Sequence, residues 1–135
     1  MLVFCAFNSV NDEHVDDFIA NTAATRGMKL EDLAPYSGMI KQSLAHLKSA
    51  NADSFWSEKQ AYLASGNLLT AAASLKIDAC PIEGFDANAY SEILGLADKN
   101  LRPCLVVTLG YRHAEDYYAG LPKVRKTKAD LFVEI

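Results

Sequence analysis

The chain has 135 residues, of which 50% are hydrophobic and 22% are charged, and its formal net charge is -4. This length and balance fit one folded domain and exclude an intrinsically disordered chain, which is poor in apolar residues. The negative charge argues against general binding to nucleic acid, which needs many cations to neutralise phosphates.

The sequence shows no pattern of a membrane span or signal peptide and no paired-cysteine motif. Its apolar runs are much shorter than the roughly 20 residues needed to span a membrane, and residues 1–4 lack the basic flank of a signal peptide. We therefore expect a cytoplasmic protein without membrane contact. Cys5, Cys80 and Cys104 form no CxxC pair, so they predict neither a disulfide framework nor a zinc site.

One strand and two helices are predicted in the first third of the chain. Residues 1–7 are mostly apolar and predict a buried strand. Val15, Phe18 and Ile19 follow at helical spacing, and the small polar run Asn21–Gly27 then predicts a loop. A second helical pattern places apolar residues at Leu33, Ile40, Leu44 and Leu47. We expect Asn51–Ser54 to end this helix and to cap the next.

The longest periodic segment runs from about Ser54 to Leu75 and is rich in Ala, Ser and Gly. Small side chains let helix backbones approach closely. Gly66 costs a helix interior about 1 kcal/mol relative to Ala, and close packing is the usual compensation. No charged residue follows Lys59 in this segment. The pattern therefore predicts a buried helix, at a subunit interface.

Pro81-Ile82-Glu83-Gly84-Phe85 follows a short connector or strand, Lys76–Cys80. Pro81 fixes φ, whereas Gly84 can adopt angles that other residues avoid. The apolar side chains of Ile82 and Phe85 are unusual for a surface turn. The local pattern favours a buried corner between two helices, and the alternative is a loop that packs against a flat apolar partner.

The rest of the chain predicts a short helix and two strands. Asp86 can cap the helix and Gly95 can end it. Leu101–Gly110 contains a continuous β-branched run and predicts a central strand. The polar segment Tyr111–Gly120 predicts a loop, and Asp130–Ile135 predicts a terminal strand.

The basic cluster near the C-terminus is the strongest candidate for ligand binding. It comprises Lys123, Arg125, Lys126 and Lys128 in an otherwise acidic protein. Arg and Lys together can hold a phosphate, although a solvated charged tail is the commoner explanation of such a cluster.

Other reactive residues have ordinary explanations beside the functional ones. Glu83 can act as a general acid or base, or it can cap the following turn. Cys80 can be a nucleophile or a small buried apolar residue. His14, His46 and His113 show no metal-ligand spacing, so no metal site is predicted.

Five blocks of this sequence resemble, in order, the C-terminal half of the flavin-dependent nitroreductase family, particularly the oxygen-insensitive NAD(P)H nitroreductase and dihydropteridine reductase group. The matching blocks are Gln60-Ala61-Tyr62-Leu63-Ala64-Ser65-Gly66-Asn67-Leu68-Leu69, Pro81-Ile82-Glu83-Gly84-Phe85-Asp86, Leu94-Gly95-Leu96, Leu105-Val106-Val107 with Gly110, and Leu121-Pro122-Lys123-Val124-Arg125.

The resemblance implies an α+β sandwich with a central sheet flanked by helices, an intertwined homodimer, and FMN at the dimer interface. Pro81, Ile82, Glu83 and Gly84 would lie along the flavin ring, with the backbone N–H groups of the last two at its N5 edge. The small-residue helix would form the dimer core, and the terminal strand would embrace the other subunit. FMN would take hydride from NAD(P)H and reduce a nitroaromatic or quinone by two electrons in a ping-pong reaction.

The same resemblance assigns the FMN phosphate to Lys123 and Arg125. It also implies that residues 1–135 form a single domain that corresponds to the C-terminal portion of the family fold. Family members begin with a further segment that contains an Arg-x-Ser phosphate motif, and Lys41 and Gln42 stand where known members carry aromatic lid residues. Two alternatives remain open: a dimerising domain that has lost FMN and catalysis, and a module that binds a phosphate ligand.

Overall fold

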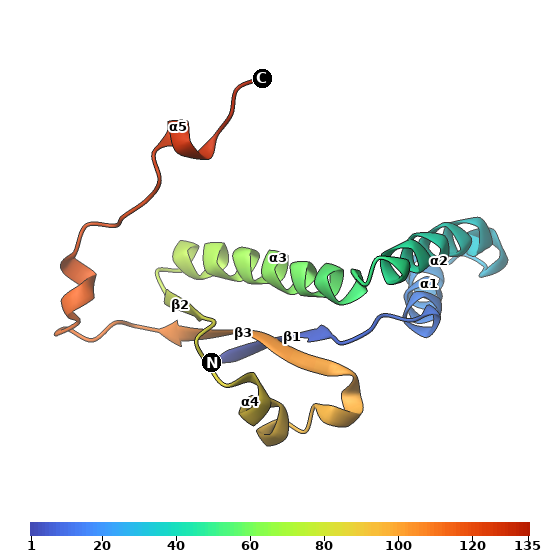
Figure 1. The fold of residues 1–135 in the computed structure, drawn as a ribbon, viewed down its shortest axis with the longest axis horizontal. Helices are drawn as coiled ribbons and strands as arrows, with labels where there is room; N and C mark the ends of the chain where they lie inside the picture. Colours follow the sequence, from blue (N-terminus) through green and yellow to red (C-terminus); the bar gives the residue numbers. More distant parts are fainter.

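The computed structural model describes residues Met1–Ile135 and shows a three-stranded antiparallel sheet with helices on both faces (Figure 1). The strands are β1 (Leu2–Phe7), β2 (Asp78–Ile82) and β3 (Leu101–Gly110), in the order β1-β3-β2. The helices are α1 (Asp12–Arg26), α2 (Ala34–Ser49), α3 (Asp53–Ser74), α4 (Ala87–Ile93) and α5 (Lys128–Leu131). Three short 3-10 helices are Glu31–Leu33, Ala97–Lys99 and Tyr117–Gly120. The predicted α+β class is confirmed.

The central position of β3 follows from its apolar, β-branched run. Val107 is 0% exposed and Val106 is 2% exposed, because α3 and α4 cover opposite faces of the sheet (Figure 1). Val107 pairs with Leu2 of β1 on one side and with Pro81 of β2 on the other. The proline lies on an edge strand, where a missing N–H is tolerated.

Helix α1 continues to Arg26, so the loop predicted over Asn21–Gly27 is wrong at every residue except Gly27. Thr22 and Ala23 are buried, and the Thr22 hydroxyl donates to a backbone carbonyl one turn earlier at 2.8 Å. Gly27 then ends the helix with φ of 63°. Burial against the neighbouring helix outweighs the weak helix propensity of this polar stretch.

A small apolar core joins α1 to α2 at the end of the sheet. Its buried members are Val10, Val15, Ile19, Ala23, Leu33 and Leu44. Asp53, in the first turn of α3, connects this core to the rest of the molecule, because its carboxylate accepts from the Ser9 hydroxyl and the Val10 backbone N–H, both at 3.2 Å. These contacts lower the pKa of Asp53. The predicted cap of α3 by Asn51–Ser54 is wrong, since its N-cap Ala52 makes no side-chain hydrogen bond.

Helix α3 buries one of its faces within this chain, and its predicted place at a subunit interface stays a prediction. The buried positions are Ser57, Ala61, Ser65 and Ala72, which are small as predicted. The side chain of Leu63 on another face is 66% exposed. Neither α3 nor any other helix combines the length and apolarity that a membrane span requires.

The predicted terminal strand Asp130–Ile135 is also wrong for the single chain. Thr127 caps α5 by accepting from the Asp130 backbone N–H at 3.2 Å, and the residues after the helix are exposed. This C-terminal segment leads away from the sheet (Figure 1). A strand needs a partner edge, and the segment meets none within its own chain.

Candidate functional site

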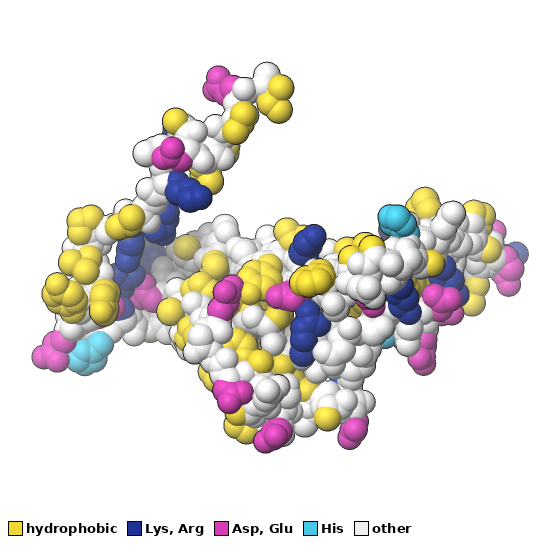
Figure 2. Space-filling view, viewed as in Figure 1, with side chains coloured by type: hydrophobic (Ala, Val, Ile, Leu, Met, Phe, Trp, Pro, Cys, Tyr) yellow, Lys and Arg dark blue, Asp and Glu magenta, His cyan; other side chains and the backbone are white.

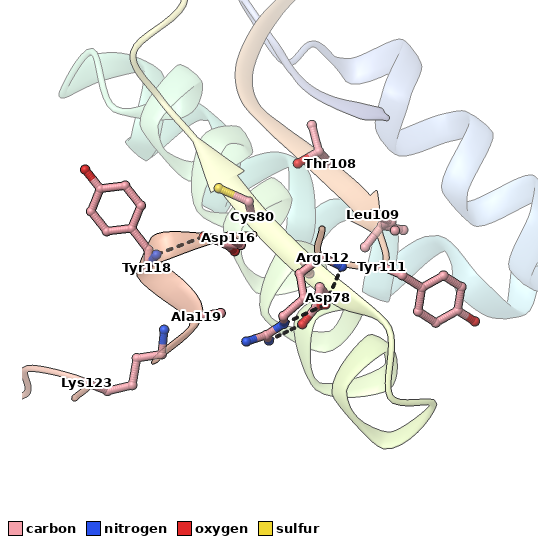
Figure 3. A pocket seen from close by; sticks show the side chains of 12 residues that line it. Asp78, Cys80, Thr108, Leu109, Tyr111, Arg112, Asp116, Tyr118, Ala119 and Lys123 are labelled. Atoms are coloured by element: carbon pink, nitrogen blue, oxygen red, sulfur yellow. Dashed lines mark hydrogen bonds and ion pairs between the residues drawn. The ribbon is translucent and has the colours of Figure 1, made fainter. Parts of the chain in front are cut away.

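Two hollows adjoin at the end of the sheet where β2 begins and β3 ends. The first, the strand-end hollow, has a volume of about 420 Å³ and is lined by Asp78, Ala79, Cys80, Thr108, Leu109, Gly110, Tyr111, Arg112, Asp116, Tyr118, Ala119 and Lys123 (Figure 3). The second, the helix-end hollow, has a volume of about 730 Å³ and is lined by Leu69, Ala73, Lys76, Ile77, Asp78, Ala79, Pro81, Arg112 and Arg125. The two hollows share Asp78, Ala79 and Arg112.

An ion pair between Asp78 and Arg112 forms part of this shared wall (Figure 3). The Asp78 carboxylate accepts from Arg112 Nε and from the Arg112 backbone N–H, each at 2.9 Å, and also from guanidinium Nη2. These bonds lower the pKa of Asp78 to about 2. The sequence analysis missed this pair, since 34 residues separate its members and only the register of β2 on β3 brings them together.

The Asp78–Arg112 pair makes a testable contribution to acid stability. Because the pKa of Asp78 is lower in the folded chain than the ordinary value of about 3.9, its contribution is complete above about pH 4 and is lost as pH falls toward about 2. We expect Asp78→Asn to be less stable than wild type at neutral pH, with the difference shrinking over that window. Chemical denaturation as a function of pH measures this, with Asp98→Asn as an exposed control; a difference independent of pH would contradict the assignment.

The predicted phosphate-binding cations lie at these hollows on the segment that follows β3. Lys123 lines the strand-end hollow and Arg125 lines the helix-end hollow together with Pro81. Arg125 Nη1 donates to the backbone carbonyl of Val124 at 2.7 Å and forms no ion pair. Figure 2 shows Lys and Arg side chains gathered along this segment, beside a hollow near one end of α3. The basic cluster therefore faces the body of the protein at Lys123 and Arg125.

Of the four residues predicted to lie along the flavin, only Pro81 lines either hollow. Pro81 and Ile82 belong to strand β2, so the favoured prediction of a buried corner between two helices is wrong. The backbone N–H groups of Glu83 and Gly84, just beyond the strand, donate to no acceptor in the protein. Both residues are exposed.

The Glu83 side chain is held by Tyr62 on α3 and does not cap the next helix. Tyr62 Oη donates to Glu83 Oε1 at 2.7 Å and lies 3.4 Å from the Cys104 carbonyl oxygen. The carboxylate raises the pKa of Tyr62 to about 12. Asp86 caps α4, as predicted. Tyr62 thus holds Glu83 in place. The two residues are 21 positions apart, and this spacing gives no sequence signal of the contact.

This hydrogen bond predicts an unusual tyrosine titration. Replacing Glu83 by Gln removes the negative acceptor, so we expect the pKa of Tyr62 to fall from about 12 toward its ordinary value of about 10. Tyrosinate absorbance followed against pH measures the change, and Tyr62→Phe should delete the same late step. Identical titration curves for wild type and Glu83→Gln would contradict the contact.

The remaining candidates lie apart from this arrangement. Cys80 is an exposed free thiol on the strand-end hollow. No group of three His, Cys, Asp or Glu side chains is placed to hold a metal ion. Lys41, at a predicted lid position, pairs with Asp16 of α1 at 2.6 Å.

Comparison with known proteins identifies the family. Residues 10–111 match the Nitroreductase family. The chain is 33% identical to the oxygen-insensitive NAD(P)H nitroreductase of Salmonella typhimurium over 93% of its own length and 58% of that protein. It is 31% identical to the protein of the same name from Enterobacter cloacae, over 99% of its length and 63% of that protein. The major NAD(P)H-flavin oxidoreductase of Aliivibrio fischeri is 43% identical over 56% of this chain and 35% of that protein.

The chain belongs to the nitroreductase family. The resemblance identified from the five sequence blocks is thereby confirmed. The chain spans less than two thirds of the length of these curated relatives.

Proposed function

We propose that this chain is part of an FMN-dependent NAD(P)H oxidoreductase that reduces nitroaromatics or quinones. Its family and the names of its relatives support an NAD(P)H oxidoreductase, and the Aliivibrio fischeri relative is named for flavin. The observation that carries the proposal is that the helix-end hollow is lined both by two cations without an ion pair, Lys76 and Arg125, and by Pro81 of the edge strand β2. Such a hollow matches a ligand with an anionic end and a flat apolar part.

The residues present fit FMN in charge and in polarity. Lys76, Arg112 and Arg125 bring three positive charges to the helix-end hollow, Asp78 brings one negative charge, and a net +2 results. A phosphate monoester carries about -1.5 to -2 at neutral pH. Arg125 of this hollow and Lys123 of the adjoining strand-end hollow would hold this group. Pro81 and, beyond the hollow, Ile82 and the N–H groups of Glu83 and Gly84 would face the flavin ring. Bound FMN would supply hydride acceptance from NAD(P)H and two-electron delivery to the substrate.

The uncovered surface of α3 supports assembly as a homodimer. The chain exposes 10372 Å². A compact monomer of 14.8 kDa would expose about 7,000 Å². The excess is roughly 3,400 Å² per chain, or about 6,800 Å² over two chains, which is the scale of the largest obligate interfaces. A second copy that packs on α3 and receives the C-terminal segment would cover this surface and would give residues 130–135 a strand partner.

Reduction of bound flavin tests the proposal directly. The protein loaded with FMN is titrated anaerobically with NADH and with NADPH, and then with a nitroaromatic or a quinone. We expect the nicotinamide to bleach the flavin absorbance and the acceptor to restore it. Failure of both nicotinamides to bleach bound flavin would overturn the oxidoreductase proposal and would favour a dimerising domain without catalysis.

A further inference from the structure

Lys76 occupies a backbone conformation that the chain otherwise reserves for glycine and asparagine. Five residues have positive φ: Gly27, Gly95, Asn51, Asn100 and Lys76. Glycine adopts this region without a steric penalty, and asparagine tolerates it through its short polar side chain. Lys76, with φ of 57°, has neither advantage. The turn itself therefore does not explain why a lysine stands at this position.

The turn at Lys76 is imposed by the end of α3. The Lys76 backbone N–H donates to the Ala73 carbonyl at 3.0 Å, and the Ile77 N–H donates to the Ala72 carbonyl at 2.9 Å. These bonds close the helix and direct the chain into β2, and glycine is the residue that usually provides such an ending. Glycine would make the same backbone bonds without strain, so the backbone alone does not account for a lysine.

The Lys76 side chain lines the helix-end hollow with Arg125 and is not committed to any carboxylate. The three ion pairs of the chain are Lys41–Asp16, Arg102–Glu58 and Arg112–Asp78. The only acidic residue that lines this hollow is Asp78, whose carboxylate accepts three hydrogen bonds from Arg112. Arg112 is correspondingly neutralised. Lys76 and Arg125 are thus the two uncommitted charges of the hollow.

We propose that Lys76 is a phosphate-binding residue that acts with Arg125 on the phosphate of FMN. The inference rests on the proposed function. Two uncommitted cations match the charge of a phosphate monoester dianion, and Lys and Arg are complementary ligands for it, one as a point charge and the other through a planar fork. The left-handed backbone at Lys76 places the cation beside the hollow, and the Asp78–Arg112 pair forms its wall.

Lys76→Gly separates binding from folding. Glycine relieves the positive-φ strain, so we expect an unchanged or higher melting temperature, whereas the dissociation constant for FMN should rise about tenfold. Riboflavin, which lacks the phosphate, should bind wild type and variant equally well. Lys76→Arg should retain FMN affinity, and Lys99→Gln, at the other end of β3, should change nothing. Fluorescence titration with each flavin and thermal unfolding of each variant supply these values.

Each outcome decides a separate point. Equal FMN affinity of wild type and Lys76→Gly would overturn the role of Lys76 while leaving the flavin proposal intact. A lower melting temperature with parallel loss of FMN and riboflavin affinity would show that Lys76 acts structurally, through the negative end of α3. If neither flavin binds wild type, the proposed function fails. Titration with inorganic phosphate then tests the phosphate-binding role of Lys76 by itself. Loss of saturable phosphate binding in Lys76→Gly supports this role, and equal binding by wild type and variant overturns it.

Discussion

Replacing Arg125 by alanine should weaken FMN binding by about 10- to 100-fold, since a hydrogen bond to a charged group contributes about 1.5–3 kcal/mol. Arg125 lines the helix-end hollow, and its only hydrogen bond within the chain is to the neighbouring Val124 carbonyl. The side chain is exposed, so its removal should leave the free energy of unfolding nearly unchanged. The loss should therefore appear in ligand affinity and not in stability.

The measurement is equilibrium titration of FMN at low and at moderate salt. Exposed charges are screened by salt, so wild-type affinity should fall as salt rises, and Arg125→Ala should respond less steeply. Arg125→Lys keeps the charge but not the planar fork and should be intermediate. Arg26→Ala, at the end of α1, removes the same charge elsewhere and should bind as wild type does. Equal FMN affinity for Arg125→Ala and wild type would remove the assigned role.

Replacing Leu63 by glutamate should convert the proposed dimer to monomer at concentrations where wild type stays associated. The Leu63 side chain is 66% exposed on α3 within one chain, and the proposed interface would bury it. A carboxylate buried there without a partner would cost several kcal/mol. The dissociation constant of the dimer should therefore rise about a hundredfold or more. The expected change is large because α3 lies at the centre of the proposed interface.

Sedimentation equilibrium of wild type and Leu63→Glu measures this change. Ile93→Glu supplies the control, because Ile93 is 81% exposed on α4, across the sheet from α3 (Figure 1). That variant should remain dimeric. A wild-type chain that is monomeric at all concentrations, or a Leu63→Glu variant that associates as wild type does, would contradict the proposed dimer.

The elements that sequence predicted well are those whose pattern is local. The β-branched run of β3 and the long periodic α3 appear close to their predicted ends. The α1 error arose because burial of Thr22 and Ala23 depends on α2, which local propensity does not describe. The terminal strand failed because its alternating pattern needs an edge that this chain alone does not offer.

The site shows the same division between local and long-range information. Lys123 and Arg125 stand out in the sequence as cations in an acidic chain, and both line hollows. The pairing of Asp78 with Arg112 depends on strand register, and the hydrogen bond from Tyr62 to Glu83 depends on how α3 packs over the sheet. Lys76 carries no sequence signal, because its significance lies in a backbone angle.

Flavin retention by the purified protein tests the central claim most directly. The protein is saturated with FMN and passed through a gel-filtration column, and the bound flavin is then released and quantified against protein. We predict an equimolar amount of FMN per chain in a peak with the mass of a dimer. A colourless peak, with all flavin eluting at the position of the free cofactor, would contradict the claim that this chain holds FMN.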